Sequence, residues 1–290
     1  MSDSIITSVS EAEPAGQALK ISVYASPTRS INGGTFSPTT SILISGSTDA
    51  ILVDAQAIKQ DVDALSEMIE RTGLKLTTIF ITHGHPDHYF GAAQLAKRFP
   101  GLQVVAAPGV VEYINKNLEQ NMKTWAEWFG DDVVSPDLLP TALKTDSIPL
   151  EGRDLRVIQI GQGDIAPSTI LQIPELDALI VGDIAYNKIH LMLALGGPKE
   201  WSNWIASVDE LERLKPRVVV VGHKKPGASD DDVATILGGT RSYIRDFGEA
   251  VKTSDSADAV VEIMKAKYPD YGNPWTLEFS AKAAMKQKAA

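Results

Sequence analysis

Three histidines and one aspartate within six residues constrain this chain more than any other feature of its sequence. His83, His85, Asp87 and His88 closely follow an apolar run at residues 77–81, which predicts a β-strand. Imidazole and carboxylate groups together suit zinc, iron or manganese. The four side chains do not share one face of a helix, so their spacing favours a tight loop. The sequence predicts a metal site at the end of a strand, and the alternative is a polar turn that happens to contain these residues.

The pattern His-x-His-x-Asp-His resembles the signature of the metallo-β-lactamase superfamily, and the resemblance extends over roughly residues 20–250. It implies that His83 and His85 hold one metal ion, whereas Asp87 and His88 hold a second. The motif is specific for the superfamily but carries almost no information about the substrate.

The predicted elements fit a single α/β domain, and periodicity alone goes no further than that. The resemblance implies a particular α+β arrangement, the four-layer αβ/βα sandwich of the superfamily. We expect this domain over residues 19–290, with C-terminal helices, and a flexible, polar extension at residues 1–18. Strands are predicted at 20–25, 39–45, 50–54, 76–81, 104–106, 154–160, 169–173, 178–181 and 217–221, and helices at 58–71, 89–99, 110–130, 199–214, 231–253 and 257–268.

Two further candidate ligands follow apolar strands later in the chain. Asp183 stands in a Gly-Asp pair after residues 179–181, and His223 stands in a Gly-His pair after residues 218–221. Each could be part of a structural turn when taken alone. The resemblance implies instead that Asp183 bridges both metals and that His223 completes the second site. Asp54 ends an earlier strand, where it either supports the metal loop or caps a turn.

The remaining ligand position departs from the superfamily pattern, which usually has a histidine there. The segment 161–168 contains none. Counting back ten residues from Pro174 gives Asp164, whereas aligning on the leading glycine gives Gln162. We favour Asp164 as a metal ligand because a carboxylate binds a divalent metal better than an amide oxygen does, although it could instead hydrogen-bond a ligand histidine. We expect two Zn²⁺ ions, with Mn²⁺ or Fe²⁺ as alternatives because a carboxylate makes the first site harder.

Composition narrows the partners and the compartment. The chain has 27 Lys plus Arg against 37 Asp plus Glu, and this net charge of −10 argues against a nucleic-acid partner. It has no cysteine, which excludes disulfides and thiolate chemistry. No apolar run is long enough to span a membrane, and the N-terminus lacks the features of a secretory signal. We therefore expect a cytoplasmic protein with a small-molecule substrate, and a homodimer remains open.

Five other residues are candidates for contact with the substrate. Trp125 and Trp128 lie three residues apart on a predicted helix, where they either pack against the core or form an apolar wall. Tyr186 and His190 follow Asp183 on a segment expected to run along the pocket, although a lone histidine is more often a core residue. Lys224 follows His223 and could pair with a substrate carboxylate or oxyanion, the alternative being a solvated loop charge.

These residues predict a metal-dependent hydrolase. Water activated by the metals attacks a carbonyl carbon, and Asp87 serves as the catalytic group that orients it and passes a proton to the leaving group. The expected reaction opens a small cyclic amide or ester, a lactam or lactone, in detoxification or catabolism. The alternatives are a thioesterase of the glyoxalase II type and an iron-dependent oxidase or dioxygenase on the same fold. A non-catalytic binding protein is disfavoured because so many candidate ligands are present.

Overall fold

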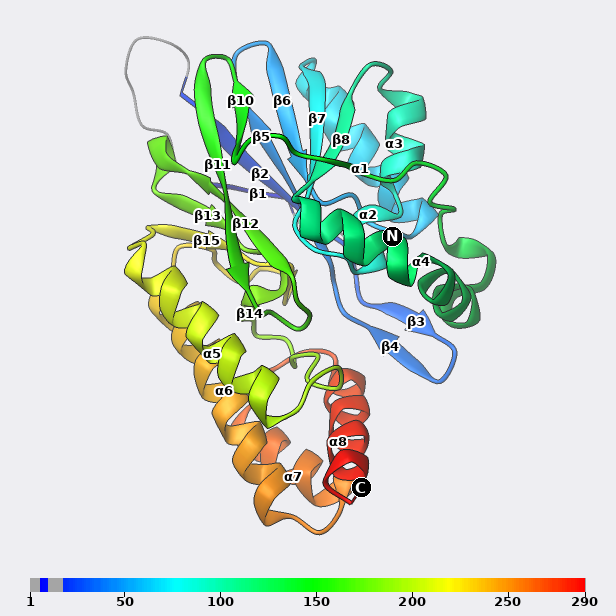
Figure 1. Cartoon of the computed structure of the whole chain (residues 1–290), viewed down its shortest axis with the longest axis vertical. Coiled ribbons are helices and arrows are strands. Elements are labelled where there is room, and N and C mark those ends of the chain that lie inside the picture. The colour runs from blue at the N-terminus through cyan, green and yellow to red at the C-terminus, as the bar shows by residue number, and fades with distance from the viewer. Residues whose placement is uncertain (1–5, 10–17, 290) are drawn as a thin grey trace.

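Two large β-sheets face each other at the centre of the protein, as the computed structural model in Figure 1 shows. The structure describes residues 6–9 and 18–289. The first sheet has the strand order β1-β2-β5-β6-β7-β8-β9, and the second has the order β10-β11-β12-β13-β15. Strands β6 to β9 run parallel, as do β13 and β15, whereas the other neighbours within these sheets are antiparallel.

The strands of the first sheet are β1 (Ile6–Val9), β2 (Lys20–Ala25), β5 (Thr40–Ser45), β6 (Asp49–Val53), β7 (Lys75–Ile81), β8 (Gln103–Ala106) and β9 (Thr141–Ala142). Those of the second are β10 (Ser147–Leu150), β11 (Arg153–Gly161), β12 (Ser168–Ile173), β13 (Ala178–Ile180) and β15 (Val218–Val220). A hairpin is formed by β3 (Arg29–Ile31) and β4 (Gly34–Phe36), and a further pair by β14 (Tyr186–Asn187) and β16 (His223–Lys224).

Helices cover the outer face of each large sheet. The first sheet is covered by α1 (Lys59–Thr72), α2 (Pro86–Tyr89), α3 (Ala92–Arg98) and α4 (Pro108–Phe129). The second is covered by α5 (Pro198–Arg213) and α6 (Val233–Thr253), and α7 (Ala257–Lys267) and α8 (Pro274–Lys288) pack beside them beyond the end of the sheets (Figure 1). Short 3-10 helices lie at Gly130–Asp132, Pro174–Leu176 and Gly182–Ile184.

The period-two alternation of the strands divides the apolar side chains between three cores. In β6, Ile51 and Val53 point between the two sheets, whereas Ala50 and Leu52 point towards the helices. The same division recurs in β13, where Leu179 alone among its residues faces α5 and α6. The layers are therefore helix, sheet, sheet and helix, which confirms the four-layer sandwich predicted from the sequence.

Several predicted elements need correction. The helix expected at residues 89–99 is shorter, at Ala92–Arg98 (α3), and a separate helical turn precedes it at Pro86–Tyr89 (α2). Asp87 and His88 therefore lie on that helical turn rather than in the tight loop that was predicted. The extension expected at residues 1–18 lies mostly outside the described residues, but Ile6–Val9 forms an edge strand of the first sheet. No helix within residues 6–9 and 18–289 is both long enough and apolar enough to cross a membrane.

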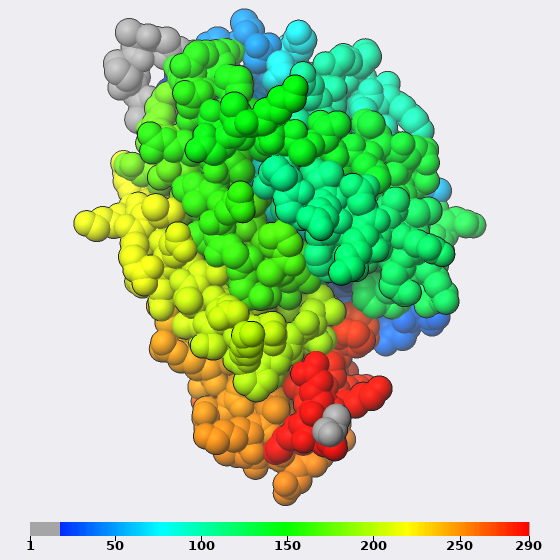
Figure 2. Space-filling view, viewed as in Figure 1, coloured from blue at the N-terminus to red at the C-terminus, as the bar shows by residue number. Residues whose placement is uncertain are grey.

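The hairpin β3–β4 and the helix α8 had no counterpart among the predicted elements. Gly34 of the hairpin lies so close to α8 that a Cβ atom there would come within 1.9 Å of the Trp275 ring. Asn273, just before α8, has a left-handed backbone (φ 54°) and its side chain hydrogen-bonds the segment that follows the hairpin. Figure 2 shows the C-terminal helix (red) beside the hairpin (blue) on the surface of the molecule. This contact places both elements next to the site described below.

Candidate metal centre

Acidic and imidazole side chains gather where strands of both sheets end at one edge of the sandwich. His83 follows β7, Asp183 follows β13, and His223 follows β15. Asp164 comes from the loop between β11 and β12. Because the carboxyl ends of parallel strands open on the same edge, side chains far apart in the sequence meet there. The complete set is His83, His85, Asp87, His88, Asp164, Asp183 and His223.

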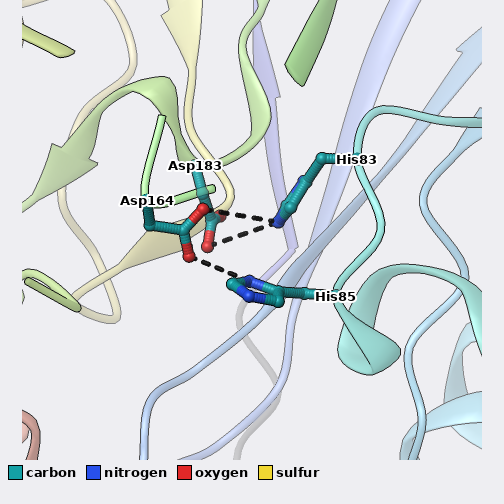
Figure 3. Close-up of side chains that lie close together, drawn as sticks. All are labelled: His83, His85, Asp164 and Asp183. Carbon is teal, nitrogen blue, oxygen red and sulfur yellow. Dashed lines mark ion pairs between the residues drawn. The ribbon is translucent and has the colours of Figure 1, made fainter. Parts of the chain in front are cut away.

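The first group consists of His83, His85, Asp164 and Asp183, whose side chains converge in Figure 3. His83 Nε2 lies 3.9 Å from Asp164 Oδ1 and 3.7 Å from Asp183 Oδ2. His85 Nδ1 lies 2.9 Å from Asp164 Oδ2. The donor atoms of this group all lie within 4.8 Å of one another, which is close enough for one cation to bind them all.

The second group consists of Asp87, His88 and His223. Asp87 Oδ2 lies 3.4 Å from Nε2 of both His88 and His223. Asp183 also borders this group, because its Oδ2 lies 3.2 Å from His223 Nε2 and its Oδ1 lies 3.4 Å from His88 Nε2. Asp183 therefore stands between the two groups, and each group with Asp183 offers two imidazoles and two carboxylates.

The donors fit divalent metal ions. His83 Nε2, His88 Nε2 and Asp183 Oδ1 are buried and have no hydrogen-bond partner among the described residues. A buried polar atom without a partner costs about 1–3 kcal/mol, so a native structure is expected to satisfy it. A cation between the imidazoles and the carboxylates would do so, and mixed nitrogen and oxygen donors suit zinc and its neighbours.

Asp54 fixes the orientation of both groups from beneath. Its Oδ2 accepts a hydrogen bond from Thr82 Oγ1 at 2.8 Å and lies 2.7 Å from His88 Nδ1, while its Oδ1 accepts from the Thr82 backbone N–H at 2.9 Å. The Thr82 hydroxyl also lies 3.0 Å from His83 Nδ1. These contacts leave the Nε2 atoms of both histidines directed at the site. Of the two roles left open for Asp54, the structure therefore shows support of the metal loop.

Neighbouring groups hold the other candidate ligands in place. The Thr39 hydroxyl donates to Asp87 Oδ2 at 2.9 Å, and the Tyr186 hydroxyl donates to Asp183 Oδ2 at 2.9 Å. His223 Nδ1 lies 2.8 Å from the Pro38 carbonyl oxygen, which can accept its proton. Such outer contacts fix the rotamer of each ligand before a metal binds.

Two glycines let the strand ends approach closely enough to form the site. A Cβ atom on Gly222 would lie 2.0 Å from Asp183 Oδ1, and one on Gly182 would lie 2.6 Å from Thr82 Oγ1. Gly182 also has a left-handed backbone, with φ 49°. The Gly-Asp and Gly-His pairs singled out in the sequence therefore have a steric reason.

The site combines strongly opposed electrostatic effects. Burial lowers the pKa of His83 well below its ordinary value, and nearby His88 lowers it further. Burial also acts to lower the pKa of His223, but Asp183 and Asp87 outweigh it and raise that pKa to about 9. Burial raises the pKa of Asp164 to about 6, although neighbouring His85 acts in the opposite direction. Metal binding must displace the protons that these groups retain.

A cavity of about 250 Å³ opens above the candidate ligands. Its floor contains Asp87, Asp164, Asp183 and His223, and its walls are largely aromatic and aliphatic. The wall residues come from the hairpin, α4, the segment before α5, and α8, and include Phe36, Trp125, Trp128, Tyr186, Met192, Leu195 and Phe279. The arrangement places a small apolar pocket directly over the metal donors.

The candidate substrate contacts divide into two sets. Trp125, Trp128 and Tyr186 line the cavity, as the sequence suggested. His190 does not: it is buried, and its Nδ1 lies 2.8 Å from the Tyr243 hydroxyl. Lys224 is also buried, with its Nζ 2.6 Å from Asp230 Oδ2, so it is not a solvated loop charge, and it does not line the cavity where a substrate anion would lie. The side chains of His190 and Lys224 therefore lie in the protein interior, where their polar atoms are paired with Tyr243 and Asp230.

The structure distinguishes the two candidates for the departing ligand position. Asp164 lies in the first group and lines the cavity above it, whereas Gln162 is not part of the cavity lining and its Nε2 donates to the Gly163 carbonyl oxygen at 3.0 Å. Sequence reasoning missed Phe36, Leu195 and Phe279. Each of the three is a single large apolar residue outside any periodic pattern, so the sequence offers little sign that it lines a cavity. In the structure, the side chains of Leu195 and Phe279 are 53% and 37% exposed.

Comparison with known proteins agrees with this arrangement. A model of the metallo-beta-lactamase superfamily matches residues 34–223. Comparison of the sequence with curated proteins finds no significant match. A metallo-beta-lactamase family protein from Thermus thermophilus has a similar structure, with 19% identity, a TM-score of 0.62, and coverage of 92% of this chain and 94% of that one.

Two further solved structures are similar over most of the chain. A metallo-beta-lactamase from Pontibacter korlensis is 20% identical with a TM-score of 0.56, and the match covers 83% of this chain and 99% of that one. The DIM-1 metallo-beta-lactamase is 18% identical with a TM-score of 0.59, covering 84% of this chain and 99% of that one. At these identities the likeness shows a common fold.

Proposed function

Because the chain belongs to the metallo-β-lactamase superfamily, whose members are mostly metallo-hydrolases, we propose that it hydrolyses a small cyclic ester or amide. One observation carries the proposal. Two adjacent groups of imidazole and carboxylate donors share Asp183 on the floor of an apolar cavity. A lactone or lactam ring fits a cavity of about 250 Å³ and presents its carbonyl group to that floor.

The candidate ligands include a group suited to proton transfer. Divalent cations bound here would supply water activation and carbonyl polarisation. Asp87 lines the cavity, and its Oδ2 accepts a hydrogen bond from Thr39. We assign Asp87 the task of holding the attacking water and carrying its proton to the leaving oxygen or nitrogen. Tyr186 lines the same cavity, and its hydroxyl group can donate a hydrogen bond to a substrate oxygen in place of the one that it donates to Asp183.

We propose two zinc ions, with manganese or iron as alternatives. Each group combines two imidazoles with two carboxylates when Asp183 is counted in both. Asp164 supplies the hard, anionic donor in the first group, where the superfamily pattern has a third histidine. This donor lowers the Lewis acidity of the bound ion and widens the choice of metal.

One observation favours a second candidate function. His83, His85 and Asp164 together form a set of two histidines and one carboxylate, which is typical of non-haem Fe(II) oxygenases. The second group of Asp87, His88 and His223 argues against it, because a one-iron enzyme does not need these donors. A thioesterase remains an alternative because thioester cleavage requires the same carbonyl chemistry.

The deciding experiment measures the metal content of protein purified without added metal, together with activity on matched substrates. Hydrolysis of a γ-lactone and an acyl thioester is followed by proton release. Opening of a γ-lactam gives a carboxylate and an ammonium group without net proton release, so it is followed by the primary amine that forms. Oxygen consumption is recorded in parallel. About two zinc or manganese ions per chain with lactone or lactam opening supports the proposal. Iron at about one per chain with oxygen consumption supports the oxygenase instead. Protein that cannot bind metal under any loading condition contradicts both.

A further inference from the structure

The walls of the cavity are largely apolar up to its mouth. Phe36 lies 5.1 Å from Trp125, measured between ring centroids, and 6.4 Å from Trp128, so the hairpin and α4 form one aromatic wall. Leu195 and Phe279 stand on the wall formed by the segment before α5 and by α8. These two are among the most exposed large apolar side chains of the described residues, at 53% and 37%. Exposed apolar groups at a cavity mouth indicate an apolar ligand.

Positive charge is missing from these walls. Among the described residues, the lining includes no lysine or arginine, and its acidic and imidazole groups are all candidate metal ligands. The polar wall residues are uncharged, for example Ser37, Thr124 and Thr276. Lys224, the basic residue next to His223, is turned away and paired with Asp230. An anionic substituent on a substrate would therefore lose its water without gaining a cationic partner.

The floor does not supply the missing positive charge. Asp87, Asp164 and Asp183 together offset most of the charge of two divalent cations. Asp54, which is buried directly beneath them, contributes a fourth carboxylate. The centre as a whole therefore has little net attraction for a further anion.

We infer that the substrate of this site is uncharged and carries an aromatic or similarly bulky apolar arm, and that the cavity rejects carboxylate-bearing molecules of the same shape. This inference rests on the proposed function for the identity of the reacting group. The discrimination between the two kinds of substrate comes from desolvation. A neutral arm gains apolar contacts with Trp128 and Phe36, whereas an anionic substituent on the arm loses its water and finds no cationic partner.

A binding experiment tests the discrimination without any reaction. The probes are N-phenyl-1-naphthylamine and 1-anilinonaphthalene-8-sulfonate, which share one aromatic skeleton and differ by a sulfonate. The metal-loaded protein should bind the neutral probe at least about tenfold more tightly. Leu195→Lys places a cation at the mouth and should narrow this ratio by about tenfold. Met122→Lys adds the same charge at an exposed position outside the cavity lining and should leave the ratio unchanged.

A kinetic experiment then extends the inference to the reaction. γ-Phenyl-γ-butyrolactone and its 4-carboxyphenyl counterpart are compared, and kcat/KM should favour the neutral lactone by roughly 10- to 100-fold. Equal rates on the two lactones, or tighter binding of the sulfonate probe by the unmodified protein, overturn the inference while leaving a hydrolase intact. Failure to open either lactone, together with no opening of the γ-lactam, contradicts the proposed function. The ratio of the two probe affinities and its response to Leu195→Lys then decide the inference by themselves.

Discussion

Asp164 and Gln162 are two residues apart in one loop, but of the two Asp164 lies against His83 and His85. We predict that Asp164→Ala lowers the metal content by about one equivalent per chain, because the first group then loses an anionic donor. Gln162→Ala, the matched control, should keep the full content. Elemental analysis of both variants after identical loading measures the difference. The assignment of Asp164 as a ligand is contradicted if both variants lose the same amount of metal, or if neither variant loses any.

His190 gives the protein a pH dependence separate from the metal centre. Burial, together with a smaller effect of the nearby Lys265 charge, lowers the pKa of His190 to about 4. The unfolded chain therefore binds more protons between pH 6.5 and pH 4, so stability falls as pH decreases through this range. Between pH 7 and pH 5 the loss from this residue is about 2 kcal/mol.

The variant His190→Asn removes this titration and serves as the comparison. Urea unfolding of both proteins at pH 5 and pH 7 should show a smaller decrease for the variant, by about 2 kcal/mol. Loss of metal at low pH affects both proteins alike and cancels in the difference. Identical decreases in the two proteins would show that His190 is not held neutral by its surroundings.

Among the structural elements, the hairpin β3–β4 and the helix α8 are linked by hydrogen bonds of Asn273, in addition to the contact of Gly34 with the Trp275 ring. The Asn273 side chain bonds Thr35, Ser37 and Thr276, and its left-handed backbone suits asparagine or glycine. Asn273→Gly keeps the backbone conformation and removes the bonds. We expect it to cost about 1–3 kcal/mol of stability and to weaken binding in the cavity, because Phe36 and Phe279 lose their fixed separation.

Lys215→Gly is a suitable control for that substitution. Lys215 is exposed and also has a left-handed backbone, with φ 51°. Glycine relieves its strain without removing a contact of the cavity wall. Urea unfolding and titration with N-phenyl-1-naphthylamine report stability and binding separately. A change in stability with unaltered binding for Asn273→Gly would show that the contact does not shape the cavity.

The same elements show how far sequence reasoning extends. Strands such as β2 were predicted with their observed bounds because apolar side chains alternate or accumulate along them. The ligand positions followed from residues placed just after those strands. Helix α8 was missed because its fully buried residues include only one large apolar side chain, Leu277, and are otherwise small or polar, such as Thr276 and Ser280. The strands of the hairpin are three residues long, too short for any period to appear.

The cavity wall was largely beyond prediction for a different reason. Phe36 meets the aromatic residues of α4, and Phe279 lines the same cavity, only through tertiary packing, which local patterns do not encode. The choice between Asp164 and Gln162 likewise depends on the path of one loop. Sequence therefore indicates which donors exist, and folding determines which of them face the site.

For the molecule as a whole, the metal centre joins two halves of the chain that are also held together by apolar packing and by hydrogen bonds such as that from Thr40 N–H to the Gly222 carbonyl oxygen. His83, His85, Asp87 and His88 come from the first half, whereas Asp164, Asp183 and His223 come from the second. Without cations, three carboxylates with exposures of 5% or less are brought together by folding. Bound metal should therefore stabilise the whole fold as well as its active site.

We predict that removal of metal with a chelator lowers the unfolding temperature. A metal ion present at about 100 times its dissociation constant contributes about 2.7 kcal/mol, which corresponds to roughly 5 °C or more in a chain of this size. Differential scanning calorimetry before chelation, after it, and after addition of zinc or manganese measures the effect and its reversal. Asp183→Ala removes the shared donor, so the unfolding temperature of that variant should respond weakly to chelator. If the unmodified protein is shown to have lost its metal and still unfolds at the same temperature, the packing and hydrogen bonds between the two halves hold them together without metal, and the donors serve chemistry without contributing to stability.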